Sequence, residues 1–199
     1  MLINKLLLWK YHDMLQHIHG RKDNEIYVTE LVECPKKREF RKQLWFLELF
    51  NPSTLIGELV HYGIGHLLKE IVKDGHVEVE VEREKSIDNV VIKGRIDAIV
   101  EDVIYEFKFM RNIKGKLPLP HHEEQLQIYG WLTGLEEGYI VYITPNGFKE
   151  YGKELHYTDD NIRVLLMNKQ SPRYNWECQY CAFADYCPFS LLHQRGGKK

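Results

Sequence analysis

The chain has 199 residues and a formal net charge of −2; 44% of its residues are hydrophobic and 28% are charged. This length suits one domain with a core of its own, and the composition is that of an ordinary globular protein. The near-neutral charge argues against a polycation that coats nucleic acid. It does not exclude a nucleic-acid enzyme, whose basic residues can be local. Because no apolar run could span a bilayer and no targeting or lipidation motif is evident, we expect an intracellular, cytoplasmic protein.

The first third of the chain is predicted to be mainly helical. Apolar residues recur at helical spacing over 2–18, 35–50 and 55–75, and Ser53 or Thr54 is expected to cap the third helix. Between the first two helices, residues 26–32 alternate weakly, which predicts a short extended segment.

The hydrophobic period then changes from about four to two, which is typical of strands. Strands are predicted over 76–85, 90–100 and 103–109, and a further strand pair over 139–143 and 148–156. A helix over 122–135, with Gly138 just beyond its end, separates the two groups, and a last helix capped by residues 158–160 runs to Asn168. This order predicts an α/β or α+β core in which helices flank a mixed sheet.

Cysteines occur only near the two ends of the chain. They are Cys34 and the C-x2-C-x5-C group Cys178, Cys181 and Cys187, and two of them precede a proline. Four thiolates complete one metal or cluster site. The sequence therefore predicts an N-terminal helical segment over 1–33, a core over 34–177 and a cluster-binding segment over 178–199 that packs with Cys34.

Three kinds of cysteine site are compatible with this pattern. Disulfides are disfavoured because they rarely persist inside cells. A structural zinc site usually takes two close pairs of ligands, and only one C-x2-C pair is present. Three close cysteines, a distant fourth and the Cys-Pro steps favour an iron–sulfur cluster, with [4Fe–4S] and [2Fe–2S] both open.

The strands over 90–100 and 103–109 carry the candidate chemistry. If Glu101-Asp102 is a two-residue turn, Asp97 faces Glu106 across the hairpin, and their Cβ atoms lie about 4.5–5.5 Å apart. Two such carboxylates repel unless a cation lies between them, and hard oxygen ligands select Mg²⁺ or Mn²⁺. Lys108 points to the same face, where it could orient a water or stabilise charge on a phosphate.

Other readings of these charged residues remain open. The alternative to a metal site is an ordinary solvent-facing charge ladder on the hairpin. In the metal-site interpretation the flanking apolar residues fall on the opposite face, towards the core; they are Ile96, Ala98, Tyr105 and Phe107. The densest basic cluster is either a solvated face or a phosphate contact. It consists of Lys36, Lys37, Arg38, Arg41 and Lys42.

Two further motifs surround the hairpin. Gly57 and His61 form a G-x3-H motif before the strands, and Gln125 and Tyr129 form a Q-x3-Y motif after them. With I-D, E-x-K and the enclosing cysteines, this ordered set resembles the CRISPR-associated iron–sulfur exonucleases, the fourth of the Cas families. These proteins form part of the RecB-like branch of the PD-(D/E)xK nucleases. The resemblance covers residues 26–190, and the ordered set is far more specific than any one motif.

The resemblance implies a PD-(D/E)xK, restriction-endonuclease-like fold and a role for each motif residue. It makes Asp97, Glu106 and Lys108 catalytic, and it implies that Gln125 and Tyr129 position the DNA strand or support the site. The metal ligands would be His61, Asp97, Glu106 and the backbone carbonyl of Phe107, and the iron–sulfur ligands would be Cys34, Cys178, Cys181 and Cys187.

The implied function is a metal-dependent single-stranded DNA exonuclease that works from a 5′ end. It would trim prespacer DNA in CRISPR adaptation with the Cas1–Cas2 integrase, using Mg²⁺ or Mn²⁺ and a [4Fe–4S] rather than a [2Fe–2S] cluster, and it could be a homo-oligomer. The alternatives are a stand-alone RecB-like repair nuclease and a non-catalytic iron–sulfur or zinc module that only binds nucleic acid.

Overall fold

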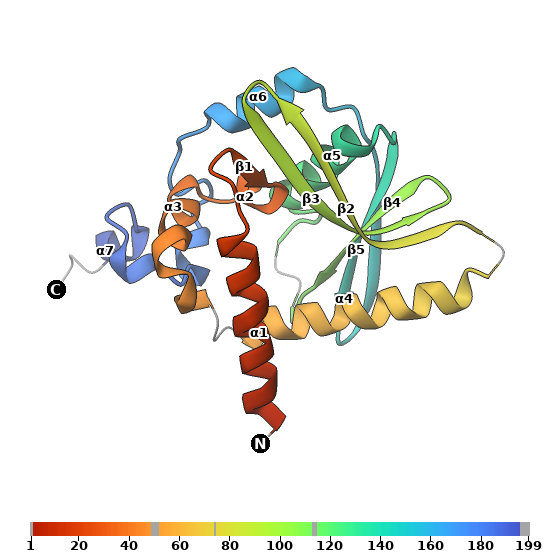
Figure 1. Cartoon of the computed structure of the whole chain (residues 1–199), viewed down its shortest axis with the longest axis horizontal. Helices are drawn as coiled ribbons and strands as arrows, with labels where there is room; N and C mark the ends of the chain where they lie inside the picture. The colour runs from red at the N-terminus through yellow and green to blue at the C-terminus, as the bar shows by residue number, and fades with distance from the viewer. Residues whose placement is uncertain (1, 49–51, 74, 113–114, 196–199) are drawn as a thin grey trace. The chain divides into compact units, whose positions relative to one another are not determined.

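The computed structural model describes residues 2–48, 52–73, 75–112 and 115–195 (Figure 1). The chain divides into two compact units. The cysteine unit comprises Met1–Glu25, Glu33–Asn51 and Met167–Lys199, and the sheet unit comprises Ile26–Val32 and Pro52–Leu166. Both units combine stretches that are distant in the sequence, and the predicted division into 1–33, 34–177 and 178–199 stays a prediction.

The sheet unit is built on a mixed sheet, as predicted. In the described part of the chain the sheet has six strands in the order β1-β3-β4-β5-β6, with β2 pairing β3. The pairs β2–β3, β3–β4 and β5–β6 are antiparallel, and β4–β5 is parallel. The strands are β1 (Glu25–Tyr27), β2 (Val77–Ile87), β3 (Val90–Val100), β4 (Val103–Phe109), β5 (Glu137–Thr144) and β6 (Gly147–Glu154).

Helices cover both faces of this sheet (Figure 1). Helix α5 (Pro120–Thr133) crosses from β4 to its parallel neighbour β5, and its Leu126 and Ile128 belong to the main core with Ile104 and Ile140. Helix α4 (Pro52–Ile71) packs Ile64 and Leu68 against a second cluster made by Ala98, Phe107 and Val141. Because side chains alternate along a strand, the two clusters lie on opposite faces.

The remaining elements are short or peripheral. Helices α2 (Val28–Val32) and α6 (Asp159–Met167) lie mainly in the sheet unit. The cysteine unit contains α1 (Leu2–His19), α3 (Pro35–Leu44), α7 (Leu191–Arg195) and the 3-10 turns η1 (Trp45–Glu48), η2 (Glu177–Tyr180) and η3 (Ala184–Tyr186). None of the described helices is long and apolar enough to cross a membrane.

The predicted strand over 26–32 is wrong beyond its start. Only Glu25–Tyr27 is extended, and α2 begins at Val28. The Glu30 carboxylate accepts a hydrogen bond of 3.1 Å from the Tyr27 amide, an interaction of the capping-box type that begins a helix.

Two predicted helix boundaries also shift. Helix α4 begins at Pro52, so Ser53 and Thr54 lie in its first turn rather than before it. Helix α5 ends at Thr133, because Gly134 adopts a left-handed conformation with φ 79° and its amide donates to the Gly130 carbonyl. Of the predicted helix over 35–50, residues 49 and 50 lie outside the described residues.

Candidate active site

The β3–β4 hairpin has the predicted register. Glu101 and Asp102 both have positive φ, 50° and 66°, as a two-residue hairpin turn of type I′ requires. The ladder runs from Val100 opposite Val103 to Ala98 opposite Tyr105 and then stops. The next register position therefore places Asp97 and Glu106 at the point where regular pairing ends.

The Asp97 side chain takes the place of the missing ladder bond. Its Oδ2 accepts a hydrogen bond of 2.7 Å from the Phe107 amide. This bond fixes the carboxylate between β3 and β4, beside the E-x-K residues of β4.

Glu106 is held by a buried polar network from α5. Its Oε1 lies 2.5 Å from the Lys108 ammonium and accepts a bond of 2.8 Å from the Gln125 amide. The Gln125 carbonyl accepts from Lys108 at 2.9 Å, and its amide also donates to the Tyr129 hydroxyl at 2.9 Å. Tyr129 in turn donates to the Arg95 carbonyl at 2.9 Å.

This network distinguishes between the two roles that the resemblance offers for the Q-x3-Y motif. Gln125 and Tyr129 are only 5% and 2% exposed. Their polar atoms are directed at Glu106, Lys108 and the β3 backbone. The arrangement favours support of the site over contact with a DNA strand.

The second oxygen of Glu106 indicates that a cation belongs here. Glu106 Oε2 is buried and has no hydrogen-bond partner. Burial, followed by the negative charge of Asp97, raises the pKa of Glu106 to about 7, although Lys108 opposes the rise. A buried carboxylate oxygen without a partner is costly, and a divalent cation would satisfy it, so the residues present fit the implied metal.

Helix α4 brings His61 to Asp97. Gly65, one turn after His61, lies so close to β2 that a Cβ there would be 2.5 Å from the Val79 side chain. His61 Nδ1 is 3.1 Å from Asp97 Oδ1. Burial lowers the pKa of His61, but its hydrogen bond to Asp97 and the negative charge there outweigh burial and raise it overall. His66, by contrast, is exposed and pairs with Glu70.

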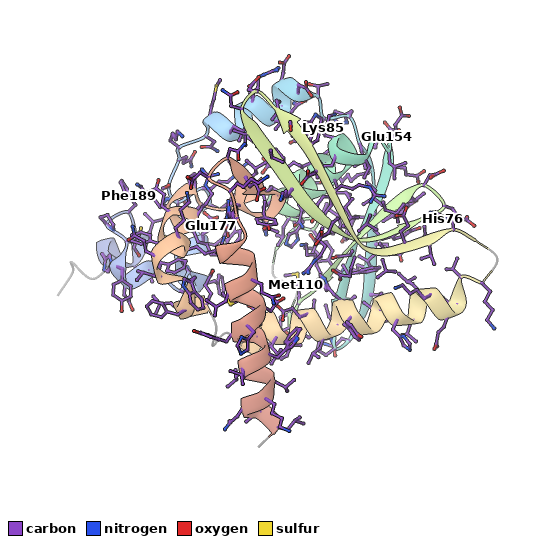
Figure 2. All side chains as sticks on the ribbon, in the orientation of Figure 1. His76, Lys85, Met110, Glu154, Glu177 and Phe189 are labelled. Atoms are coloured by element: carbon purple, nitrogen blue, oxygen red, sulfur yellow. The ribbon has the colours of Figure 1, made fainter. Side chains whose placement is uncertain are left out.

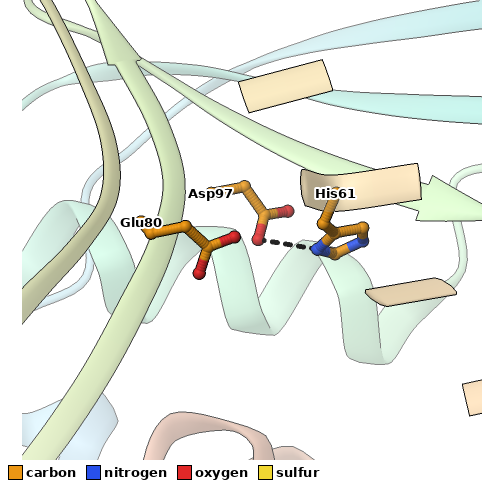
Figure 3. Close-up of side chains that lie close together, drawn as sticks. All are labelled: His61, Glu80 and Asp97. Atoms are coloured by element: carbon orange, nitrogen blue, oxygen red, sulfur yellow. Dashed lines mark ion pairs between the residues drawn. The ribbon is translucent and has the colours of Figure 1, made fainter. Parts of the chain in front are cut away.

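Glu80 is an acidic residue near His61 and Asp97 that none of the sequence motifs contains. Ligand atoms of His61, Glu80 and Asp97 all lie within 4.8 Å of one another, and they form a candidate metal group in the described residues (Figure 3). The alternation over 76–85 places the glutamates of β2 towards solvent. The turn at Asp88-Asn89 was the available signal, because the register it sets places Glu80 opposite Asp97.

The alternative of a solvent-facing charge ladder is wrong. Asp97 and Glu106 are 8% and 1% exposed, because helices cover both faces of the sheet. The apolar neighbours do not share one face either: Ala98, Tyr105 and Phe107 join the cluster that packs on α4, whereas Ile96 belongs to the main core. The set is therefore a buried site and not a solvent-facing charge ladder.

The cysteine unit brings the N-terminal cysteine to the C-terminal ones. Glu177 (labelled in Figure 2) accepts hydrogen bonds of 2.8 Å from the Cys34 amide and of 2.8 Å from the Tyr174 amide. Burial raises the pKa of the Cys181 and Cys187 thiols, and the nearby Cys34 and Cys178 raise it further. None of the four cysteines forms a disulfide. This donor set fits a four-thiolate site.

Part of the basic cluster serves the cysteine unit itself. Arg41 pairs with Glu33 at 2.5 Å and with Glu48 at 2.6 Å, and Lys37 pairs with Glu33 at 2.9 Å. The Lys37 and Arg41 side chains are 28% and 22% exposed, and their ion pairs lie within the cysteine unit. Glu33 and Glu48 neutralise them. A phosphate contact of the basic cluster stays a prediction.

Known proteins resemble the chain over nearly its whole length. No protein-family model matches the sequence. A CRISPR-associated exonuclease Cas4 of Saccharolobus solfataricus is 38% identical over an alignment of 207 positions. The alignment covers 96% of this chain and 100% of that protein. The crystal structure of SSO0001 has a TM-score of 0.85 at 39% identity and covers 96% of this chain and 98% of its own.

A more distant structure has the same fold. An alkaline exonuclease, LHK-Exo from Laribacter hongkongensis, matches with a TM-score of 0.52 at 15% identity, covering 92% of this chain and 98% of its own. The fold is therefore of the PD-(D/E)xK type, as the motifs predict.

Proposed function

The chain belongs to the Cas4 family of CRISPR-associated exonucleases, and from this premise we propose that it is a divalent-metal-dependent exodeoxyribonuclease. Its substrate is single-stranded DNA, which it degrades from the 5′ end, and its task is the trimming of prespacer DNA with the Cas1–Cas2 integrase. The observation that carries the metal-dependent chemistry is the buried, unpartnered Glu106 Oε2 beside Asp97.

The residues of the site divide the work between them. His61, Asp97, Glu106 and the Phe107 carbonyl would hold Mg²⁺ or Mn²⁺, which supplies water activation and neutralises charge on the scissile phosphate. Lys108 donates to Glu106 and Gln125, which uses two of its three N–H donors. The third donor serves a water or phosphate oxygen. A module that only binds nucleic acid would have no use for two buried carboxylates beside a phosphate.

The four cysteines hold an iron–sulfur cluster in this proposal, with [4Fe–4S] favoured. Cys34 precedes Pro35 at the start of α3, and Cys178, Cys181 and Cys187 lie in or next to two 3-10 turns. The cluster is structural: it joins the two ends of the chain within the cysteine unit. Anaerobic purification followed by a visible spectrum and metal analysis tests this, and zinc without iron would contradict the cluster.

A cleavage assay tests the activity. Single-stranded and duplex oligonucleotides, labelled at the 5′ or the 3′ end, are incubated with anaerobically purified protein and Mn²⁺, with Mg²⁺ or with EDTA. We expect rapid release of the 5′ label from single strands and no cleavage in EDTA. Preference for duplex DNA or first release of the 3′ label would contradict the proposed substrate or polarity.

Two isosteric variants assign the activity to the site. Asp97→Asn should reduce the rate by at least about 10³-fold, because losing a metal ligand removes several kcal/mol of transition-state stabilisation. Asp102→Asn is the matched control, since it makes the same charge change in the exposed turn of the same hairpin. Wild-type activity in Asp97→Asn would refute the assignment.

A further inference from the structure

Asp97 lies in the middle of a row of three carboxylates on three neighbouring strands. The register that pairs Val79 with Ala98 and Val81 with Ile96 places Glu80 opposite Asp97 on β2. The hairpin register places Glu106 opposite Asp97 on β4. Glu106 belongs to the E-x-K motif, whereas Glu80 belongs to none of the motifs and has no assigned role.

The backbone brings the Glu80 carboxylate close to Asp97 and His61. Glu80 has φ 54°, a left-handed conformation that is uncommon for a residue other than glycine. Its carboxylate, the Asp97 carboxylate and the His61 ring come together from β2, β3 and α4 (Figure 3).

The spacing of these groups suits one small divalent cation. Ligands of Mg²⁺ lie about 2.0–2.1 Å from the ion, so two of them are at most about 4.2 Å apart. Only trans ligands lie that far apart, since cis ligands of an octahedral ion are about 2.9 Å apart. The ligand atoms of His61, Glu80 and Asp97 are all within 4.8 Å of one another. Closing this group around an ion therefore requires each ligand atom to move by up to about 1 Å, which rotation of the side chains allows.

Glu106 lies outside this tight group and is fixed elsewhere. Its Oε1 is held by Lys108 and Gln125, and its Oε2 is the buried oxygen without a partner. Lys108 balances charge on the Glu106 side of Asp97, which leaves the Glu80 side to other cations.

The ion pair of Glu80 with Arg95 does not supply the missing charge. Arg95 Nε lies 2.9 Å from Glu80 Oε2, but the Arg95 side chain is 58% exposed. Such surface pairs contribute little, and they could form without bringing Glu80 to Asp97.

We propose that Glu80 is a further ligand of the divalent cation that His61 and Asp97 hold. The proposal rests on the proposed nuclease function for the identity of the ion. It adds a ligand from β2 that the G-x3-H, I-D and E-x-K motifs do not contain. The cation site is therefore built from both hairpins of the sheet and not from the β3–β4 hairpin alone.

Calorimetric titration of the metal-free protein with Mn²⁺ tests the proposal without requiring cleavage. Glu80→Gln should weaken Mn²⁺ binding at least about tenfold, the scale on which even outer-shell partners of a metal site affect affinity. Glu84→Gln is the matched control, because it removes an exposed, ion-paired carboxylate from the same strand. It should bind Mn²⁺ like the wild type.

A third variant separates ligation from simple charge attraction. Glu80→Asp keeps the charge but withdraws the oxygens by one methylene. If Glu80 is a ligand, Glu80→Asp loses most of the affinity that Glu80→Gln loses. Wild-type affinity in Glu80→Asp, or in Glu80→Gln, would overturn the proposal.

Thermal unfolding supplies a second test, because Glu80→Gln should have different effects on stability without and with Mn²⁺. In EDTA, Glu80→Gln should be at least as stable as the wild type, because it relieves repulsion with Asp97. With Mn²⁺, its gain in unfolding temperature should be smaller than that of the wild type. An equal gain would overturn the proposal. If no variant cleaves DNA but this Mn²⁺ pattern holds, the nuclease proposal fails and the Glu80 assignment stands.

Discussion

The sheet unit and the cysteine unit differ in what holds them together. The sheet unit has a continuous core on one face of its sheet and a second cluster on the other. Among the described residues of the cysteine unit, the buried apolar side chains are Cys178, Phe183 and Ala184. Phe183 stacks on Phe40 with ring centroids 6.0 Å apart.

This difference decides how each unit responds to losing its site. The sheet unit can carry buried carboxylates that repel one another, because its core supplies the stability. The cysteine unit has little apolar burial of its own, so its fold should depend on the proposed cluster. Ligand variants should therefore abolish activity in the sheet unit and folding in the cysteine unit.

The largest expected effect is in the cysteine unit. Cys34→Ala should remove a tie across roughly 140 residues, worth on the order of 4–5 kcal/mol by the chain-entropy argument. Denaturant unfolding under anaerobic conditions should show an early transition of the cysteine unit, and the visible absorbance should be lost. Tyr180→Ser, an exposed change between two cysteines, is the control. A stable, fully coloured Cys34→Ala protein would show that the cysteine unit does not need Cys34 for its cluster or its stability.

In the sheet unit, Lys108 should affect turnover and not folding. Lys108→Met keeps the aliphatic stem but removes the donor to Glu106 and Gln125. We expect kcat to fall about 10²–10³-fold with little change in KM, because the ammonium acts on charge that develops in the transition state. Steady-state kinetics on a labelled single strand measures this, and a change confined to KM would mean that Lys108 only binds substrate.

Glu106→Gln should make the metal-free protein more stable, because the ionised Glu106 carboxylate destabilises the sheet unit. The pKa of Glu106 is raised to about 7, so in the wild type the stabilising protonated form is lost as pH rises through that value. Glutamine does not ionise. In EDTA at pH 8 the variant should therefore be more stable by on the order of 1–3 kcal/mol, with the gain shrinking towards pH 5. Unfolding temperatures across this pH range test it, and a pH-independent difference would contradict the cause.

The smallest expected effect concerns the approach of α4 to the sheet. Gly65→Ala would place a Cβ 2.5 Å from the Val79 side chain, which should cost about 1–2 kcal/mol and displace His61. Gly63→Ala meets nothing within 4 Å, so it should gain about 0.5–1 kcal/mol from helix propensity. Equal effects of the two substitutions on thermal unfolding would show that close packing does not position the helix.

The cysteine unit also shows where sequence patterns mislead. The basic residues after Cys34 suggested a surface, yet Lys37 and Arg41 are paired with Glu33 and Glu48 inside the unit. A charge run does not reveal which acidic residues will lie against it. Glu48 lies beyond α3, and only the packed chain brings it to Arg41.

The sequence by itself determined the part of the candidate active site that depends on a local turn. Glu101-Asp102 sets the β3–β4 register, and the register sets the position of Asp97 relative to Glu106. Hairpin pairing is local, because two turn residues fix which residues face each other. The ordered motifs and the four cysteines also identified the family from the sequence alone.

Only the tertiary structure decided how those residues are used. It buried Asp97 and Glu106 between α4 and α5, turned Gln125 and Tyr129 towards the site, and brought Glu80 to His61. Alternation along β2 marks its glutamates as solvent-facing, because a strand pattern does not record what covers its polar face. That cover comes from helices distant in sequence, and their packing sets both the burial of the carboxylates and their need for a cation.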